Sequence, residues 1–277
     1  MHTVILYFEI FWVMFCVRLK AAGICIFVGL IAEALAKREP RSTSDSRFFN
    51  YGCTAIYFAA EITLGLIIAI EAGRIVGLAH SRLHILQSRP GIAFSLLLAL
   101  LTSILGDLGY YWLHRWEHKS KWLRAIHEIH HSDESVNVTS ALRIHWLEVI
   151  FTPLLALIPS IFLPNPITVL PASYLISNAN AFFNHLNLPI RWGWFDRILI
   201  SPSSHRLHHS TFPQHIDKNF AGVWMFWDVL FGTYVHPVKG EHPPTGLSYS
   251  TEKPTVASGV VKPFRVWRTL LHSDEVG

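Results

Sequence analysis

Residues 91–118, GIAFSLLLALLTSILGDLGYYWLHRWEH, join a long apolar run directly to a pair of histidines. The run at 91–113 exceeds the roughly 20 residues that an α-helix needs to cross the hydrocarbon core of a bilayer. His114 and His118 follow it at once, and their spacing of four places both rings on one face of a helix. This stretch therefore predicts a membrane helix that ends in a polar site.

Two further apolar regions indicate more membrane helices. Residues 54–76 are typical of one span, although Glu61 and Glu71 interrupt it. Residues 147–183 are apolar except at a central Pro164-Asn165-Pro166, which cannot continue a helix. We interpret this region as a hairpin of two helices, each long enough to cross the membrane or to enter it deeply.

The first 36 residues are also apolar, but Arg18 and Lys20 divide them into two pieces. Each piece is short for a full span. The sequence thus predicts an all-α fold, a polytopic membrane helical bundle of about four transmembrane helices. A cytoplasmic helical cap would hold a histidine-rich site for two metals.

The composition agrees with a membrane protein and excludes several other classes. Hydrophobic residues make up 51% of the chain and charged residues 15%, and the mean hydropathy is +0.33. The net charge of +4 reflects few charges rather than a basic face, so we expect no nucleic acid partner. The three cysteines include no C-x-x-C pair, which excludes an iron–sulfur site or a disulfide framework.

Loop charges predict the orientation in the membrane. The loop at 37–47 carries four basic residues, which favours the cytoplasmic side. If the spans alternate, the histidine clusters and everything after residue 183 face the cytoplasm as well. The start of the chain lacks the basic region of a signal peptide, so we expect it to be retained. We expect an integral, multi-pass protein of a bacterial inner membrane or the endoplasmic reticulum.

The chain has 17 histidines, and most of them fall in tight clusters. Imidazole is the commonest neutral metal ligand. Isolated histidines usually fill a core, but burying three clusters of titratable rings without a use would carry a large desolvation cost. Each cluster sets its rings three or four residues apart, on one helix face: His114-Arg-Trp-Glu-His118, His127-Glu-Ile-His130-His131 and His205-Arg-Leu-His208-His209.

The ligand count narrows the choice of metal. A structural zinc takes four ligands and a catalytic zinc three plus water, so these clusters exceed one zinc and suffice for two metals. An all-nitrogen set suits a borderline divalent ion such as iron, although zinc, copper or nickel would bind imidazole too. Asp107 lies in step with His114 and His118, and we expect it to hold a ring N–H of a ligand.

The histidine series H-x3-H, H-x2-H-H and H-x2-H-H after apolar spans resembles the fatty acid hydroxylase and sterol desaturase superfamily of integral-membrane di-iron oxygenases. The resemblance is good over residues 100–236 and weak before them. It is carried by these further stretches: Asp107-Leu-Gly-Tyr-Tyr-Trp-Leu-His114-Arg115, His131-Ser132, Asn137, Thr139, Ala141-Leu-Arg-Ile-His145, Glu148, Asn184-His185, Asn187-Leu-Pro189, Ser201-Pro-Ser-Ser-His205, Asn219-Phe-Ala-Gly222, Trp227-Asp228 and Leu230-Phe-Gly-Thr-Tyr234.

The resemblance implies a ligand set and a domain division. His185 is included by its position alone, and His145 is either a base behind the ligands or a ligand itself. Asp107, His145 and Glu148 are the implied candidates for catalytic support. We divide the chain into an N-terminal transmembrane region (1–99), a fatty acid hydroxylase-like catalytic core (100–236) and a C-terminal tail (237–277), of which 240–277 is expected to be mobile. The implied ligands of two iron ions are His114, His118, His127, His130, His131, His185, His205, His208 and His209.

The resemblance also implies a reaction. A membrane-bound enzyme would activate dioxygen with external electrons, and would hydroxylate or desaturate a lipid such as a fatty acyl chain or a sterol. The chain holds no flavin, nicotinamide or iron–sulfur motif, so we expect an external electron-donor protein, with a reduced pterin as the alternative. The oligomeric state stays open.

Two other functions remain open at this point. One is an ether-lipid or lipid-headgroup monooxygenase of the same architecture. The other, from a different class, is a histidine-rich membrane metal transporter. A transporter would be expected to place its ligands near the bilayer centre, where Glu61 and Glu71 are the obvious candidates.

Overall fold

The computed structural model describes residues 2–37, 43–82, 91–163, 166–249 and 254–273. Within these ranges the chain is helical and has no strand, only an isolated antiparallel bridge between Ser210 and Thr245. The predicted all-α fold is confirmed. The α-helices are α1 His2–Ala36, α2 Ser44–Ala60, α3 Leu66–Arg82, α4 Ile92–Lys119, α5 Lys121–His131, α6 Phe151–Phe162, α7 Pro166–Asn184, α8 Pro202–His208, α9 Phe226–Leu230 and α10 Val256–Ser273.

Short helical turns complete the described chain. A π-helical turn joins α2 to α3, and four 3-10 turns lie in the connections after α5, α7 and α8: Val138–Leu142, Trp146–Ile150, Gly193–Arg197 and Pro213–His215.

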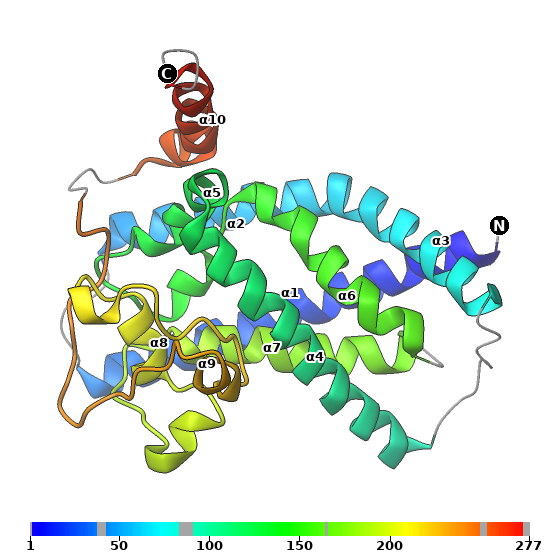
Figure 1. The fold of residues 1–277 in the computed structure, drawn as a ribbon, viewed down its shortest axis with the longest axis horizontal. Helices are drawn as coiled ribbons and strands as arrows, with labels where there is room; N and C mark the ends of the chain where they lie inside the picture. The colour runs from blue at the N-terminus through cyan, green and yellow to red at the C-terminus, as the bar shows by residue number, and fades with distance from the viewer. Residues whose placement is uncertain (1, 38–42, 83–90, 164–165, 250–253, 274–277) are drawn as a thin grey trace.

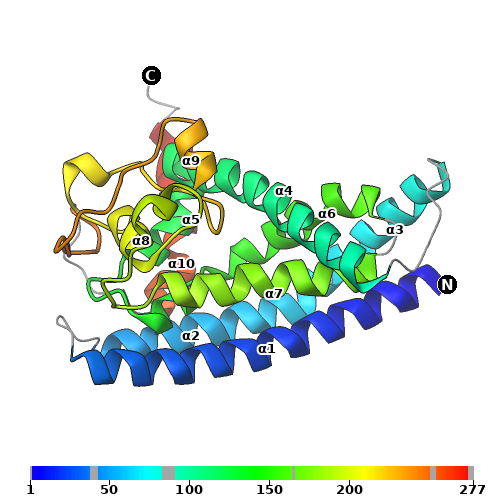
Figure 2. The same ribbon diagram turned by 90° about the horizontal axis from the view of Figure 1, so that it is seen from below.

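Long helices form a bundle, with the shorter ones gathered at one end. Helix α1 packs against α7 and α3, and α4 packs against α7 and α5. α8 and α9 lie at the end of the bundle opposite the N-terminus (Figures 1 and 2). Among the described residues, three helical stretches are long and apolar enough to cross a membrane: Phe11–Ala36, Ser44–Ala79 and Ile92–Lys119. The fourth transmembrane pass and the cytoplasmic side of the short helices stay predictions.

Helix α1 corrects the prediction that basic residues divide the first apolar region. It runs without a break past Arg18 and Lys20. The guanidinium of Arg18 lies 2.7 Å from a carboxylate oxygen of Glu61, so its charge is paired inside the bundle rather than exposed to lipid. One long helix therefore replaces the two short pieces.

The other predicted spans differ in how well they match. Residues 54–76 lie in one helical stretch, which includes the π-turn Glu61–Gly65. The hairpin exists as α6 and α7, and the turn at 164–165 lies outside the described residues. Helix α6 has 12 residues, about 18 Å at 1.5 Å per residue, which is too short to cross a bilayer.

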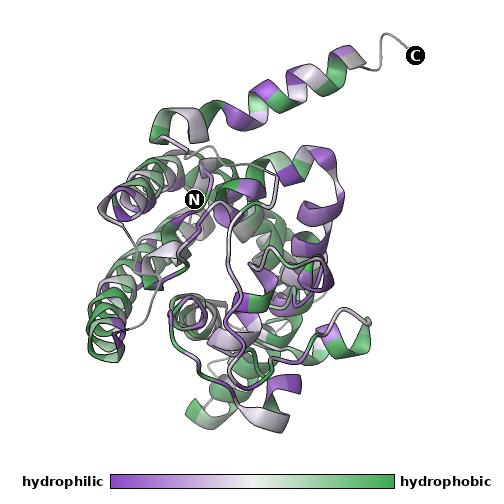
Figure 3. Ribbon diagram, turned by 90° about the vertical axis from the view of Figure 1, so that its left-hand side faces the viewer, coloured by the Kyte–Doolittle hydropathy of each residue, from purple (hydrophilic) through white to green (hydrophobic). Residues whose placement is uncertain are grey.

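The C-terminal region corrects the prediction of a mobile tail over 240–277. Its helix α10 alternates hydrophilic and hydrophobic residues (Figure 3) and packs against α5 and α2. The indole of Trp267 donates to the carbonyl of Trp122 at 2.9 Å, and Lys262 pairs with Glu128. Helix α10 thus packs against α5 and α2, which its polar composition did not predict.

Candidate metal centre

Nine histidines from four parts of the chain converge around the C-terminal half of α5. They come from α4, from α5, from the residue after α7, and from α8 with the residue after it. Their ring nitrogens form two groups of possible metal ligands, and within each group the atoms lie within 4.8 Å of one another. The first group is His114, His118, His127, His131 and His208, and the second is His130, His185, His205 and His209.

The H-x2-H-H spacing explains why one helix serves both groups. On α5, His127 and His131 are one turn apart and belong to the first group, whereas His130 belongs to the second. On α8 the division is reversed, with His208 in the first group and His205 and His209 in the second. Two residues four positions apart lie on the same face of an α-helix. The histidine just before the second of them points to a different side of the helix. Each short helix therefore faces two sites.

The first group has the spacing of a metal site. The Nε2 atoms of His114 and His127 lie 3.0 Å apart, and those of His118 and His131 lie 3.1 Å apart. The Nε2 atoms of His127 and His131 are separated by 3.2 Å. Nitrogens that share one ion at about 2.1 Å lie about 3.0–3.4 Å from each other. These rings therefore fit a common ion.

The second group repeats this spacing. The Nε2 atom of His185 lies 3.2 Å from that of His130 and 3.1 Å from that of His205. The Nε2 atoms of His205 and His209 are 3.1 Å apart. His185, which the sequence analysis included by position alone, thus lies among the other rings of this group.

Backbone carbonyls fix the orientation of several rings. The Nδ1–H of His114 donates to the carbonyl of Phe220 at 2.7 Å, and that of His208 donates to Lys218 at 2.7 Å. His185 donates in the same way to Ala181 at 2.6 Å. A carbonyl can only accept, so the proton lies on Nδ1 and the lone pair on Nε2. These contacts hold the rings ready to bind a metal.

Burial keeps the rings in the neutral, ligand form. Desolvation lowers the pKa of His127 to about 3 and that of His185 to about 4. It also holds the pKa of His205 and His209 well below the ordinary value, helped by the neighbouring rings. At neutral pH none of these imidazoles carries a proton that a metal would have to displace.

Two carboxylates face the outer nitrogen of His127. Its Nδ1 lies 3.4 Å from Oε2 of Glu117 and 3.7 Å from Oε1 of Glu148. Burial raises the pKa of Glu148 to about 7, partly offset by His145. The sequence analysis named Glu148 but missed Glu117. Glu117 follows His114 by three residues on α4, and this helical spacing is the signal that could have found it.

Asp107 has a different partner from the one predicted. Its carboxylate accepts the backbone N–H groups of Gly222, Val223 and Trp224 at 3.0, 2.9 and 2.8 Å, and no ring of the described histidines. Asp107 thus positions the segment whose carbonyl holds His114.

His145 also lies away from both groups. Its Nδ1 accepts the backbone N–H of Leu147 at 3.1 Å, and its Nε2–H donates to the carbonyl of Val260 on α10 at 3.2 Å. Burial lowers the pKa of its ring, partly offset by the Val260 carbonyl and Glu148. In this structure His145 caps a helical turn and anchors α10, which differs from the expected base or ligand.

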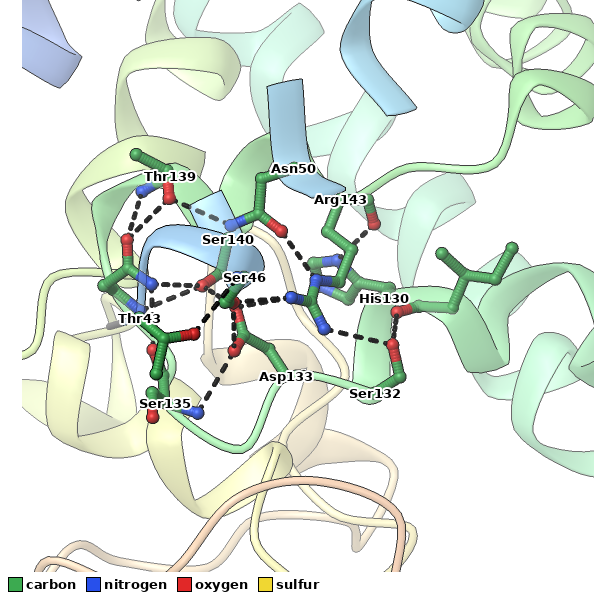
Figure 4. A network of polar contacts seen from close by, with 12 residues as sticks. Thr43, Ser46, Asn50, His130, Ser132, Asp133, Ser135, Thr139, Ser140 and Arg143 are labelled. Carbon is green, nitrogen blue, oxygen red and sulfur yellow. Dashed lines mark hydrogen bonds and ion pairs between the residues drawn. The ribbon is translucent and has the colours of Figure 1, made fainter. Parts of the chain in front are cut away.

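A buried polar network stands behind His130 (Figure 4). The Nδ1–H of His130 donates to the carbonyl of Arg143 at 3.3 Å. The guanidinium of Arg143 donates to Asn50 and Ser46 of α2, both at 2.7 Å, and lies 3.4 Å from the carboxylate of Asp133. This network ties α2 to the segment that follows α5, and so fixes the backbone that holds His130.

A cavity of about 300 Å³ lies between the histidines and the helical bundle. Four of the nine rings line it, those of His127, His130, His185 and His205. Phe151 and Leu155 of α6 form part of its apolar wall. A molecule in this cavity would reach both groups of ring nitrogens.

Comparison with known proteins identifies relatives of this part of the chain. A family described as fatty acid hydroxylase matches residues 99–233. Alkylglycerol monooxygenase of Danio rerio is 37% identical over 46% of the chain and 28% of its own length. Ornithine lipid hydroxylase of Rhizobium tropici is 30% identical over 65% of the chain and 54% of its own length.

A third relative, the delta(7)-sterol 5(6)-desaturase of Gibberella zeae, is 24% identical over 62% of the chain and 52% of its length. The chain therefore spans between about a quarter and about half of these relatives. No solved structure matches the chain significantly.

Proposed function

Because the chain belongs to the fatty acid hydroxylase and sterol desaturase superfamily, we propose that it is a membrane-bound oxidoreductase that hydroxylates or desaturates a lipid. It would use two iron ions, dioxygen and electrons from an external donor protein. The observation that carries this proposal is the pair of histidine groups, in which six pairs of neighbouring Nε2 atoms lie 3.0–3.2 Å apart.

The ligand chemistry favours this activity. Nine neutral imidazoles fit two borderline divalent ions, and iron is the natural choice for a dioxygen reaction. Iron bound there would supply reductive activation of dioxygen and oxidation of an unactivated C–H bond. The two groups include His127 and His131 on one side of α5 and His130 on the other, so both ions would be held by one rigid helix.

The surrounding residues hold and balance this centre. Glu117 and Glu148 face the outer nitrogen of His127, where they orient the ring and offset positive charge. The Asp217 carboxylate lies 3.4 Å from Nδ1 of His118 and acts in the same way. The network around Arg143 fixes its backbone carbonyl, which accepts a hydrogen bond from His130.

The cavity supports a lipid substrate. It starts at the histidines and continues among the helices of the bundle. A membrane lipid could enter between these helices and place a carbon beside the two groups. Which carbon lies there decides between hydroxylation and desaturation.

Two of the relatives support a second substrate class for the same site. One is named alkylglycerol monooxygenase and another ornithine lipid hydroxylase. An ether lipid or a lipid headgroup is therefore the alternative substrate. A metal transporter fits less well, because the rings form two closed groups at the end of α4 and not a path through the candidate spans.

Metal content and product formation test this proposal together. The chain is purified in mild detergent after iron-replete expression, and metal per chain is measured by elemental analysis. We expect close to two irons, reduced in His130→Ala, and lipid oxidation that is lost in His208→Ala. His236→Ala, an exposed histidine outside both groups, is the matched control. Retained lipid oxidation in His208→Ala would remove the di-iron assignment.

A further inference from the structure

The cavity at the histidines continues along one face of α7. Its lining residues on this helix recur at intervals of three or four, as one helical face requires. From Tyr174 to Asn184 the helix rises about 15 Å at 1.5 Å per residue. The cavity therefore reaches that far from His185 into the bundle. Leu170 and Ala181 are apolar, but most of these side chains are polar: Ser173, Tyr174, Ser177, Asn178 and Asn184.

A charged pair lies at the level of Tyr174. Arg18 of α1 lines the cavity, interacts electrostatically with Tyr174, and pairs with Glu61 at 2.7 Å. The side chains of Arg18 and Glu61 are only 12% and 13% exposed. Both residues lie inside candidate membrane spans. An ionisable residue within a span is costly and is by default the sign of a functional site.

The Arg18–Glu61 pair has features that an ion pair joining two helices would not need. Glu61 begins the π-turn Glu61–Gly65, and π-turns within α-helices are frequent at functional sites. Its second oxygen, Oε2, is buried and has no hydrogen-bond partner among the described residues. Oε2 is closed off, so Arg18 is the member of the pair that faces the cavity.

We propose that Arg18, held by its ion pair with Glu61, binds a hydroxyl group at the end of the substrate remote from the carbon that is oxidised. The hydroxyl oxygen accepts from the guanidinium of Arg18, and its O–H donates to a side-chain oxygen of the same cavity wall, where Tyr57 and Tyr174 lie. A neutral hydroxyl fits better than an anion, because Glu61 already neutralises Arg18. This inference rests on the proposed function and narrows its substrate to a long hydroxylated lipid, with about 15 Å between the hydroxyl and the reacting carbon.

Direct binding to the purified full-length chain tests the proposal. The probes are radiolabelled hexadecan-1-ol, its methyl ether and hexadecane, which share one chain and differ in the hydrogen bonds that they can make. We expect the alcohol to bind at least tenfold more tightly than the alkane, as one hydrogen bond to a charged group implies. The ether, which accepts but does not donate, should lie between them. Equal affinity for all three probes would overturn the proposal, and this comparison needs no variant.

Two double variants locate the preference. In Arg18→Met/Glu61→Leu no unpaired charge remains, so the helices can still pack. We expect this variant to bind hexadecane as before and to lose the preference for the alcohol. The matched control is Arg74→Met/Glu71→Leu, which removes an exposed pair of the same 2.7 Å length. An unchanged alcohol preference in the Arg18/Glu61 variant would contradict the proposal.

The same measurements on metal-free protein separate this inference from the proposed function. Binding at Arg18 needs no metal, so the alcohol preference should persist after chelation and in His130→Ala. Alcohol preference without any lipid oxidation would leave the binding site standing and remove the proposed function. Oxidation with no preference among the three probes would do the reverse.

Discussion

The carboxylate of Glu117 lies 3.4 Å from Nδ1 of His127, on the side of the ring opposite the nitrogen that faces the other histidines. This arrangement links a buried acid on α4 to a ligand candidate on α5. A carboxylate in this place makes the ring a stronger ligand and holds its orientation.

Glu117→Gln should weaken metal binding. Loss of a carboxylate behind a ligating histidine typically costs about 10–100-fold in metal affinity. We expect a fall of this size in the affinity for ferrous iron, measured by competition with a chromophoric chelator. Glu71→Gln, a change at an exposed carboxylate, should leave the affinity unchanged. Equal affinity in Glu117→Gln and the unmodified chain would show that this carboxylate does not act on His127.

Gly222→Ala should destabilise the loop that supports His114. A Cβ at this position would lie 2.9 Å from Oδ1 of Asp107 and 3.1 Å from the ring of Tyr110. Overpacking of this kind costs about 1–3 kcal/mol, so we expect a lower melting temperature and a reduced iron content. In Gly23→Ala the added Cβ has nothing within 4 Å, and the melting temperature should not fall.

Arg143→Met should be strongly destabilising. The change would leave the carboxylate of Asp133, which is 1% exposed, without its ion-pair partner. Breaking a buried pair from one side costs about 3–5 kcal/mol. Chemical unfolding in detergent measures this loss. Arg74→Met breaks an exposed pair and should cost less than about 1 kcal/mol. Similar losses in the two variants would mean that the network behind His130 is not needed for stability.

The metal-free protein should lose stability as the pH falls below neutral. The pKa of His127 is lowered to about 3 and that of His185 to about 4 in the fold, against about 6.5 in an unfolded chain. Between these values the unfolded state binds more protons, so the free energy of unfolding decreases as the pH decreases. This loss begins near pH 6.5 and continues to about pH 3, the lower of the two folded pKa values.

Thermal unfolding of the chelated protein between pH 7.5 and 4.5 checks this dependence. The melting temperature should fall steadily, and His127→Gln should reduce the slope because one titrating ring is removed. A melting temperature that is flat or rises on acidification would contradict the assignment of neutral buried rings.

Local patterns along the chain were sufficient for much of this architecture. The apolar run at 91–113 predicted a helix that the structure contains, with His114 and His118 at its end. The interval of four between His127 and His131 predicted that both rings share a face, and the structure puts them in one group. Periodicity is a property of a single helix, so the sequence expresses it directly.

Patterns of charge predicted the structure less well where a charged residue or a polar segment contacts another helix. The charges of Arg18 and Lys20 predicted two short apolar pieces, but Glu61 of another helical element pairs with Arg18 within one long helix. The composition of residues 240–277 predicts a mobile tail, but α10 packs against α5. In both cases the prediction assumed that the polar side chains face solvent, whereas they contact a neighbouring helix.

The sequence by itself determined the helical class, the apolar spans and the histidine spacing, because each depends on residues within a few turns of one another. Only the tertiary structure decided the division of nine rings into two groups, the contact of Asp107 with the loop at Gly222 and the place of Glu117 behind His127. These relationships join residues on different elements. They follow from how the helices pack, and packing is a sum of many weak contacts that no local pattern encodes.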